Sequence, residues 1–335
     1  MRGARRALAP RLLHRRRCRC TPAAPPTPLA QQSDLLALEF GQWQGADPTH
    51  RQRYSEGAAA LAQSVRALAP GARHEAVQLC GDGVAPAAAI AQQQAEASAL
   101  LRSGPAAGRV ITLGGDCGVE PVPIGYLNER HGGQLVVIWL DAHGDLNTAE
   151  TSPSGHYHGM ALWALLDPPA TNTSPAVVPR PLLPEQLVLA GVRSLDPAEE
   201  AFLASSAIPV LPPSALLGSS TNRIHGSRSD AARTDALLAA LRSAGMSEPH
   251  TQLYVHLDLD VLEPSQFPHV AVPEAGGLPP AVLLAVCAAI REEFGERVCG
   301  VSVTELALGR QARPQQRAAA TGYVGAVLEA LLGAG

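Results

Sequence analysis

The sequence LVVIWLDAHGD, residues 135–145, decides the fold of this chain. Its first six residues are apolar, and such a run is too short for a typical helix but long enough for a β-strand. Because both faces of this strand must be buried, the run is typical of a parallel sheet that helices cover on both sides. Charged residues follow at once, at the end of the strand where open parallel sheets bind their ligands.

Similar apolar runs recur along the chain and alternate with Ala- and Leu-rich stretches of helical period. We predict further buried strands over 109–113, 187–192, 253–259 and 298–303. We predict helices over 57–68, 85–102, 231–244, 280–294 and 316–332, and surface loops over 167–185 and 213–230. This alternation indicates one three-layer α/β domain with a central parallel sheet.

The composition is typical of a globular protein. Of 335 residues, 46% are hydrophobic and 17% are charged, which excludes a disordered chain. No run approaches the roughly 18 apolar residues of a membrane helix, so we expect no membrane segment. The 26 basic residues include eight arginines within residues 1–20, which leaves 18 basic residues against 30 acidic ones. This acidic balance argues against a nucleic-acid partner.

The N-terminus differs in composition from the rest of the chain. Residues 1–30 are rich in Arg, Pro and Ala and contain no acid, since the first acidic residue is Asp34. This composition favours an organelle transit peptide, mitochondrial or plastid, followed by a domain over residues 31–335. A basic arm that binds nucleic acid and a tail without a role are the alternatives. If the leader is retained, we expect a cytoplasmic protein.

Two segments would place potential metal ligands on one side of a strand if the strand continues through them. In DAHGD these are Asp141, His143 and Asp145, and in the later HLDLD they are Asp258 and Asp260. A spacing of two residues puts side chains on the same face of a strand. An unpaired buried carboxylate is costly, and a divalent cation compensates for that cost. For a single motif of this kind, solvated loop residues or helix caps are the alternative.

Four carboxylates and one imidazole form a set of mostly oxygen ligands, which suits Mn²⁺ better than a structural zinc site. Four acids can neutralise two divalent cations, and two adjacent cations can bind and deprotonate one water. The product is a nucleophile for hydrolysis at neutral pH. His256 also lies in HLDLD, and we expect it to be a core histidine outside the site.

Three motifs together resemble the arginase/agmatinase (ureohydrolase) family: DAHGDLN, SGHYHGM and HLDLDVLEP, in this order. The upstream GGDC resembles the GGDH element of the family, and the resemblance covers roughly residues 105–310. It implies an arginase/deacetylase-like α/β domain with a parallel sheet of about eight strands. It also implies a binuclear manganese centre, a small guanidino substrate, and a homo-oligomer that is a trimer or a hexamer.

The resemblance assigns the metal ligands residue by residue. Asp141 and Asp258 would bridge both cations. His143 and Asp260 would complete one position, and Asp145 would contribute to the other and to catalysis.

The second metal position departs from the family, because Cys117 stands where GGDH has a histidine. A thiolate is a soft ligand, whereas Mn²⁺ prefers oxygen and nitrogen. A weaker site, a different metal such as zinc, nickel or iron, and loss of activity are all open consequences. The alternative is that Cys117 is a small buried residue beside a tight turn.

Two further residues match catalytic positions of the family. His158, in SGHYHG, aligns with the histidine that passes a proton to the leaving amine, a role that suits an imidazole. Glu305, in VSVTEL, aligns with the acid that pairs with the substrate guanidinium. Two parallel hydrogen bonds between a carboxylate and a planar cation would also orient the substrate.

Three residues match positions that bind the amino-acid part of the substrate, and a fourth departs from the family. Asn147 and Ser154 align with groups that hold the α-carboxylate, and Asp196 aligns with the acid that binds the α-amino group. Asp196 also precedes a proline and is typical of a helix N-cap. His156 replaces an asparagine that contacts the α-carboxylate. Val272 stands where a threonine is expected.

We therefore expect hydrolysis of L-arginine to L-ornithine and urea by a metal-bridging hydroxide. Agmatine or another guanidino acid is the alternative substrate. A catalytically silent relative that acts as a binding or regulatory subunit is the alternative from a different class, and Cys117 supports it. Metal-dependent deacylation is a weaker third reading.

Overall fold

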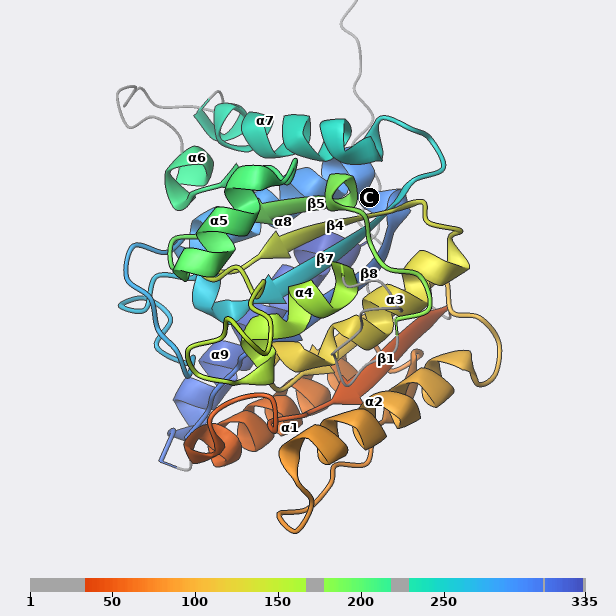
Figure 1. Cartoon of the computed structure of the whole chain (residues 1–335), viewed down its shortest axis with the longest axis vertical. Coiled ribbons are helices and arrows are strands. Elements are labelled where there is room, and N and C mark those ends of the chain that lie inside the picture. Colours follow the sequence, from red (N-terminus) through yellow and green to blue (C-terminus); the bar gives the residue numbers. More distant parts are fainter. Residues whose placement is uncertain (1–33, 167–177, 218–228, 310, 334–335) are drawn as a thin grey trace, which may run out of the picture.

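The computed structural model describes residues 34–166, 178–217, 229–309 and 311–333 (Figure 1). Eight strands form one sheet in the order β2-β1-β3-β8-β7-β4-β5-β6, and every strand pair is parallel. The strands are β1 Leu35–Phe40, β2 Arg73–Ala76, β3 Arg109–Gly114, β4 Leu135–Leu140, β5 Leu187–Ala190, β6 Val210–Leu211, β7 Gln252–Asp258 and β8 Val298–Thr304. The predicted three-layer α/β architecture is confirmed.

Helices cover both faces of this sheet. One face packs against α1 Arg51–Leu68, α6 Pro213–Leu217, α7 Ser229–Leu241, α8 Pro280–Phe294 and α9 Pro314–Leu332. The other face packs against α2 Pro86–Arg102, α3 Pro121–Arg130, α4 Ala161–Leu166 and α5 Pro197–Ser205. Most of these helices begin with proline, which suits the first helical turn because its missing N–H would have no helical partner there.

Two predicted segments need comment. The loop predicted over 213–230 is wrong at both ends, because 213–217 form the short helix α6, which begins with Pro213, and 229–230 already belong to α7. Residues 218–228, and residues 167–177 of the other predicted loop, lie outside the described residues, as does the leader over 1–30. The leader therefore stays a prediction.

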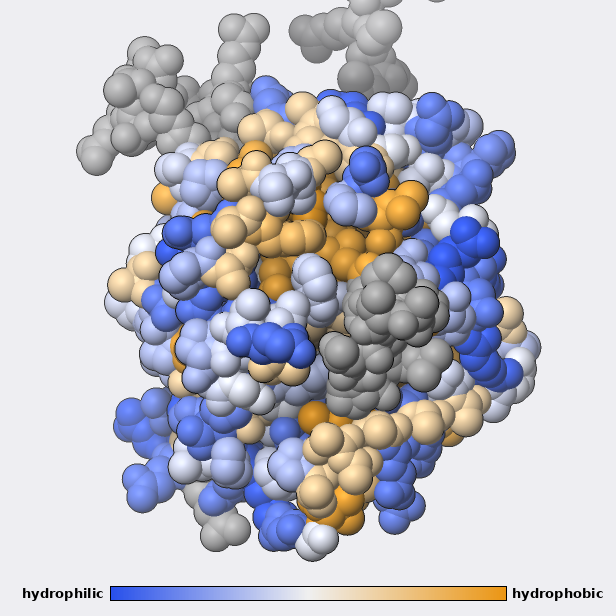
Figure 2. Space-filling view, in the orientation of Figure 1, coloured by the Kyte–Doolittle hydropathy of each residue, from blue (hydrophilic) through white to orange (hydrophobic). Residues whose placement is uncertain are grey.

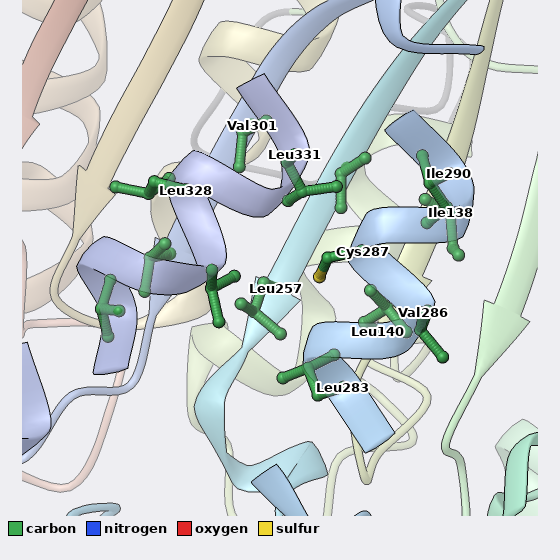
Figure 3. Packing of buried hydrophobic residues seen from close by; sticks show 14 of the residues in the cluster. Ile138, Leu140, Leu257, Leu283, Val286, Cys287, Ile290, Val301, Leu328 and Leu331 are labelled. Carbon is green, nitrogen blue, oxygen red and sulfur yellow. The ribbon is translucent and has the colours of Figure 1, made fainter. Parts of the chain in front are cut away.

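The strands divide their side chains between two cores. In β4, Ile138 and Leu140 pack with α8 and α9, whereas Val137 and Trp139 point to the opposite layer. Figure 3 shows the first of these cores, with Cys287 of α8 directed toward the strands. Burying one such aliphatic side chain stabilises the fold by roughly 1.5–3 kcal/mol, so β4 is held firmly from both sides.

The surface is mixed in polarity. Figure 2 shows hydrophilic residues around the margins of one face and an apolar area in its upper middle. Within the described residues, no helix is both long and apolar enough to cross a membrane. The apolar residues of the chain instead go largely into the two faces of the sheet.

The central strands bring distant motifs together. Strands β4 and β7 are neighbours in parallel register, with Leu140 opposite Leu257, so the residues after each strand lie at the same edge of the sheet. The arrowheads of both strands point to the left in Figure 1. The predicted metal ligands follow these two strands.

Candidate active site

Three buried aspartates lie at the ends of β4 and β7. Asp141, Asp258 and Asp260 are each at most 3% exposed. Asp260 Oδ1 accepts a hydrogen bond from the backbone N–H of Ala142 at 3.1 Å, which ties the two strand ends together. Asp258 Oδ1 accepts from the N–H of Asp260 at 2.7 Å, so the turn after β7 holds its own carboxylate in place.

His143 completes one group of potential ligands with Asp141 and Asp260. Its Nδ1 lies 3.0 Å from Asp260 Oδ2 and 3.4 Å from Asp141 Oδ1. Burial by itself lowers the pKa of His143, but the two carboxylates raise it well above its ordinary value. The three side chains thus face a common point beside the cavity described below.

Asp145 lies in a strained position close enough to Asp141, His143 and Asp260 to interact electrostatically with them. It has φ of 52°, and apart from Glu305 with φ of 64° it is the one non-glycine residue with positive φ in the described ranges. Such strain persists where the surrounding structure holds a side chain in a set direction, often at functional sites. The buried Oδ2 of Asp145 has no hydrogen-bond partner within the described part of the chain.

The acids repel one another in this buried cluster. Burial and the nearby carboxylates raise the pKa of Asp258 and of Asp145 well above the ordinary value, and that of Asp260 to about 6. Carboxylates this close cannot all be ionised without a compensating positive charge. The crowding, together with the orphaned oxygen of Asp145, fits the binding of divalent cations.

Cys117 lies on the buried side of the cluster, in the turn after β3. Its Sγ is 3.1 Å from Asp258 Oδ2 and 3.1 Å from Thr304 Oγ1. Burial, with Asp258 and the other acids, raises the pKa of the thiol well above its ordinary value. The structure therefore places Cys117 against the predicted ligands, as the alignment with GGDH requires.

Glu305 follows β8 and receives three neighbours. Its Oε1 accepts a hydrogen bond from the N–H of Cys117 at 3.2 Å and lies 3.2 Å from His158 Nδ1. Its Oε2 accepts a hydrogen bond from the hydroxyl of Tyr54, which comes from α1. Burial lowers the pKa of His158, but Glu305 and Asp116 raise it overall. The carboxylate is thus fixed, with its neighbours directed at it.

One cavity of about 330 Å³ joins the acids to the other predicted residues. Its lining includes His143, Asp145, Asp258, Asp260, His158 and Glu305, together with Asn147, Ser154, His156, Asp196 and Val272. All the predicted site residues except the fully buried Asp141 and Cys117 line this cavity. The sequence-predicted residues are therefore brought together in one place.

Asp196 is both a helix N-cap and a polar residue of the cavity wall, as the sequence predicts. It is the N-cap of α5, and its Oδ2 accepts a hydrogen bond from the amide of Asn147 at 2.8 Å. Asn147 Oδ1 in turn accepts from Thr151 Oγ1 at 3.0 Å, which fixes the orientation of the amide. This chain of bonds forms one wall of the cavity.

Sequence reasoning missed three residues that shape the site. Tyr54 gives no local signal, because it reaches Glu305 from 251 positions away. Asp116 is fully buried and accepts hydrogen bonds from Gly45 and Gly118, so it holds the turn before Cys117. Glu199 accepts from the N–H groups of Leu146 and Asp196. Its spacing of three from the N-cap is a capping-box signal that could have revealed it.

Comparison with known proteins assigns the family. The model of the arginase family matches residues 23–327. The arginase of Bacillus caldovelox is 38% identical over 172 residues, which are 50% of this chain and 52% of that protein. The N(omega)-hydroxy-L-arginine amidinohydrolase of Streptomyces lavendulae is 30% identical over 197 residues, 58% of this chain and 60% of that protein. The chain thus matches little more than half the length of these curated relatives.

A solved structure shares the fold. The arginase of Entamoeba histolytica, in complex with L-ornithine, superposes with a TM-score of 0.69 at 17% identity, over 89% of this chain and 97% of that one. At this identity the likeness supports the architecture alone. The family model, which spans most of the chain and includes every predicted site residue, shows that the chain belongs to the arginase family.

Proposed function

We propose that this protein hydrolyses L-arginine to L-ornithine and urea with the help of two divalent cations. One observation carries the proposal: a single cavity is lined at one place by the buried acids and at another by residues suited to an α-amino acid. The names of the two curated relatives support a guanidino amino acid as the substrate class.

The cation ligands would be the buried carboxylates and His143. Asp141, His143 and Asp260 form one group whose ligand atoms lie within 4.8 Å of one another. Oxygen and imidazole ligands of this kind suit Mn²⁺, while Ni²⁺, Zn²⁺ and Fe²⁺ remain candidates because Cys117 adjoins the cluster. The chemistry that such cations supply is the activation of a water for attack at neutral pH.

The chain's own residues orient the guanidinium and move the proton. Glu305 would accept hydrogen bonds from the guanidinium, since it lines the cavity and is held by Tyr54 and the N–H of Cys117. Addition of water to the guanidinium carbon is followed by cleavage of its bond to the side-chain nitrogen. His158, beside Glu305, would pass a proton to the departing nitrogen, so that both protons of the added water end on that nitrogen, the positive charge of the guanidinium leaves on the side-chain ammonium of ornithine, and urea leaves neutral.

The polar wall of the cavity would bind the amino-acid end of the substrate. Asp196 offers a carboxylate to the α-amino group. Asn147 donates one amide hydrogen to Asp196 and keeps a second for the α-carboxylate, because its NH₂ group carries two donors. Ser154 and His156 line the same side of the cavity and can also donate.

The test compares substrates on the metal-loaded full-length chain. Urea release is measured with L-arginine, agmatine and 4-guanidinobutanoate after loading with Mn²⁺, Ni²⁺ or Zn²⁺. We expect L-arginine to have the highest kcat/KM, about 100-fold above agmatine, since the loss of a charged contact costs roughly 2–3 kcal/mol. Preference for agmatine would assign the alternative substrate and remove the roles proposed for the α-carboxylate, whereas preference for 4-guanidinobutanoate, which lacks the α-amino group, would remove the role of Asp196. Metal binding without urea release from any of the three would favour a silent binding subunit.

A homo-oligomer, trimer or hexamer, is part of the same proposal. Sedimentation analysis of the full-length chain measures it directly. A monomer at the concentrations used for the urea assay would contradict that part alone.

A further inference from the structure

His256 is buried, as predicted, but its surroundings are not those of an ordinary core histidine. It lies in the middle of β7, fully buried, and its ring stacks on Trp139 with centroids 3.7 Å apart and planes 28° apart. Its Nε2 lies 3.8 Å from Cys117 Sγ and 3.8 Å from Asp141 Oδ2. One nitrogen of the ring therefore points at two potential metal ligands.

The other ring nitrogen, Nδ1, faces Ser302 and Glu120 on the side away from Cys117 and Asp141. His256 Nδ1 lies 3.2 Å from Ser302 Oγ and 3.4 Å from Glu120 Oε1. Glu120 is fully buried, and its second oxygen accepts a hydrogen bond from the hydroxyl of Tyr254 at 3.0 Å. Metal-binding histidines characteristically donate their rear N–H to a carboxylate, which fixes the ring and leaves the front nitrogen to the metal. Glu120 occupies that rear position.

The distances suit a single ion. Bonds of about 2.3 Å to sulfur and about 2.0–2.1 Å to nitrogen and oxygen place the ligand atoms of a tetrahedral ion about 3.3–3.6 Å apart. The observed separations of 3.8 Å around His256 Nε2 are slightly larger. The atoms of Cys117, Asp141 and His256 all lie within 4.8 Å of one another. Small side-chain movements would close this group around a cation.

The site is connected to the cavity. Asp258 Oδ2 lies 3.1 Å from Cys117 Sγ, and Asp258 itself lines the cavity. A cation that reaches Asp258 from the cavity is therefore next to the sulfur.

We propose that the inner of the two cations is held by Cys117 Sγ, His256 Nε2 and Asp141 Oδ2, with Asp258 on the cavity side. The inner position would then take its imidazole from β7, while the turn after β3, where the family has a histidine, supplies a thiolate. As the metal–sulfur bond forms, the thiol proton passes to solvent. The inference rests on the proposed metal-dependent function, but it concerns binding and not turnover.

A consequence concerns the choice of metal. A thiolate and an imidazole are softer than the carboxylates of the outer group, so the inner position should prefer Zn²⁺ or Co²⁺ to Mn²⁺. The outer group of Asp141, His143 and Asp260 keeps its preference for oxygen-binding ions. The two positions of the cluster would thus differ in the ion they retain.

Cobalt reports the sulfur directly. Metal-free full-length protein is titrated with Co²⁺, and we expect a thiolate-to-cobalt charge-transfer band in the near ultraviolet that saturates with one equivalent. Zinc X-ray absorption on the unmodified protein provides a second measurement, with one sulfur at about 2.3 Å at the inner ion. Two bound equivalents of either metal without a sulfur ligand would overturn the proposal.

Matched variants separate the ligands from buried neighbours. Cys117→Ser should abolish the band, whereas Cys287→Ser, a buried cysteine of α8 outside the cluster, should keep it. His256→Gln should reduce retained zinc from two equivalents to one, and His131→Gln, at a partly buried histidine that follows α3 and belongs to neither group of ligands, should leave it unchanged. Glu120→Gln should weaken zinc binding about 10–100-fold, the usual effect of losing the carboxylate behind a metal-bound histidine.

Two outcomes distinguish this inference from the proposed function. A sulfur-dependent band without urea release from any guanidino substrate would support the inner site and contradict the hydrolase. Urea release with unchanged zinc content and spectrum in His256→Gln would support the hydrolase and show that His256 is a structural partner of Glu120.

Discussion

The two halves of the proposed metal cluster are built in different ways. The outer half consists of the buried Asp141 and of His143 and Asp260, which line the cavity, and the side chain of His143 is 25% exposed. The inner half adds Cys117 and His256, which are buried in the sheet. The outer ligands come from the two motifs that follow the neighbouring strands β4 and β7, whereas the inner half also needs Cys117 from the turn after β3, which is two strands away from β7 in the sheet. The motifs are visible in the sequence, but the proximity of His256 to Cys117 and Asp141 is not.

Because the two halves have different ligands, we expect the two sides of the Asp141 carboxylate to bind different metal ions. Asp141 contributes to both halves, since its Oδ1 faces His143 and its Oδ2 faces His256. The outer half is rich in oxygen, and the inner half contains sulfur. Substitutions can therefore remove one half, the other or both.

Removal of the shared carboxylate should have the largest effect. Asp141→Asn takes a charged ligand from both halves at once, so we expect less than one equivalent of retained metal. Urea release from L-arginine should fall by at least about 10³-fold, which corresponds to roughly 4 kcal/mol in the barrier. Metal analysis and initial rates on the same sample measure both. Two retained equivalents would show that Asp141 is not shared.

Removal of the outer half alone should have a smaller and more selective effect. Asp260→Asn should lose the outer ion, keep the inner one, and reduce urea release about 100-fold. The cobalt–sulfur band should remain in this variant and disappear in Cys117→Ser. If both variants lose the same ion, the two halves are one site.

The free energy of unfolding in the presence of Zn²⁺ or Mn²⁺ should distinguish the inner half of the cluster from the outer half. A ligand that binds the folded state alone raises the free energy of unfolding by about 2.7 kcal/mol at a free concentration about 100 times its Kd. We expect Zn²⁺ to stabilise metal-free protein more than Mn²⁺ does. His256→Gln should abolish that advantage while retaining the Mn²⁺ effect. Thermal unfolding with each metal in turn gives the comparison, and an equal response to both ions would contradict it.

The smallest effect is expected away from the cluster. Asp196→Asn should raise KM for L-arginine about 10-fold, the effect of weakening one charged hydrogen bond. KM for 4-guanidinobutanoate and the metal content should stay unchanged, because 4-guanidinobutanoate lacks the amino group that Asp196 would bind and Asp196 contacts no proposed metal ligand. A parallel rise for both substrates would place Asp196 outside the recognition of the amino-acid end.

The sequence predicts the central strands and the outer ligands well. Strand β4 is apolar throughout, and such strands are buried in parallel sheets. Edge strand β2, with the sequence RHEA, carries no apolar pattern, and β6 has two residues. These strands form because their neighbours offer backbone partners, which no local pattern reveals.

In the candidate site, too, residues in short motifs were predictable, whereas residues placed by packing were not. The spacing in DAHGD and HLDLD predicts residues that the structure brings together. Tyr54 behind Glu305 and Glu120 behind His256 are set by packing between elements distant in sequence. His256 was expected to be a core histidine outside the site, and its burial is correct. The sequence did not show that its Nε2 lies near Cys117 and Asp141; the fold does.

The most direct test of the account is a joint measurement of metal content and urea release on the unmodified full-length chain. Metal-free protein is reloaded with Zn²⁺ and then Mn²⁺, dialysed, and assayed with L-arginine. The account predicts two retained ions per chain, no urea release before loading, and equal amounts of urea and ornithine after it. Two retained ions with no urea from L-arginine would contradict it, as would urea release that is the same before and after metal removal.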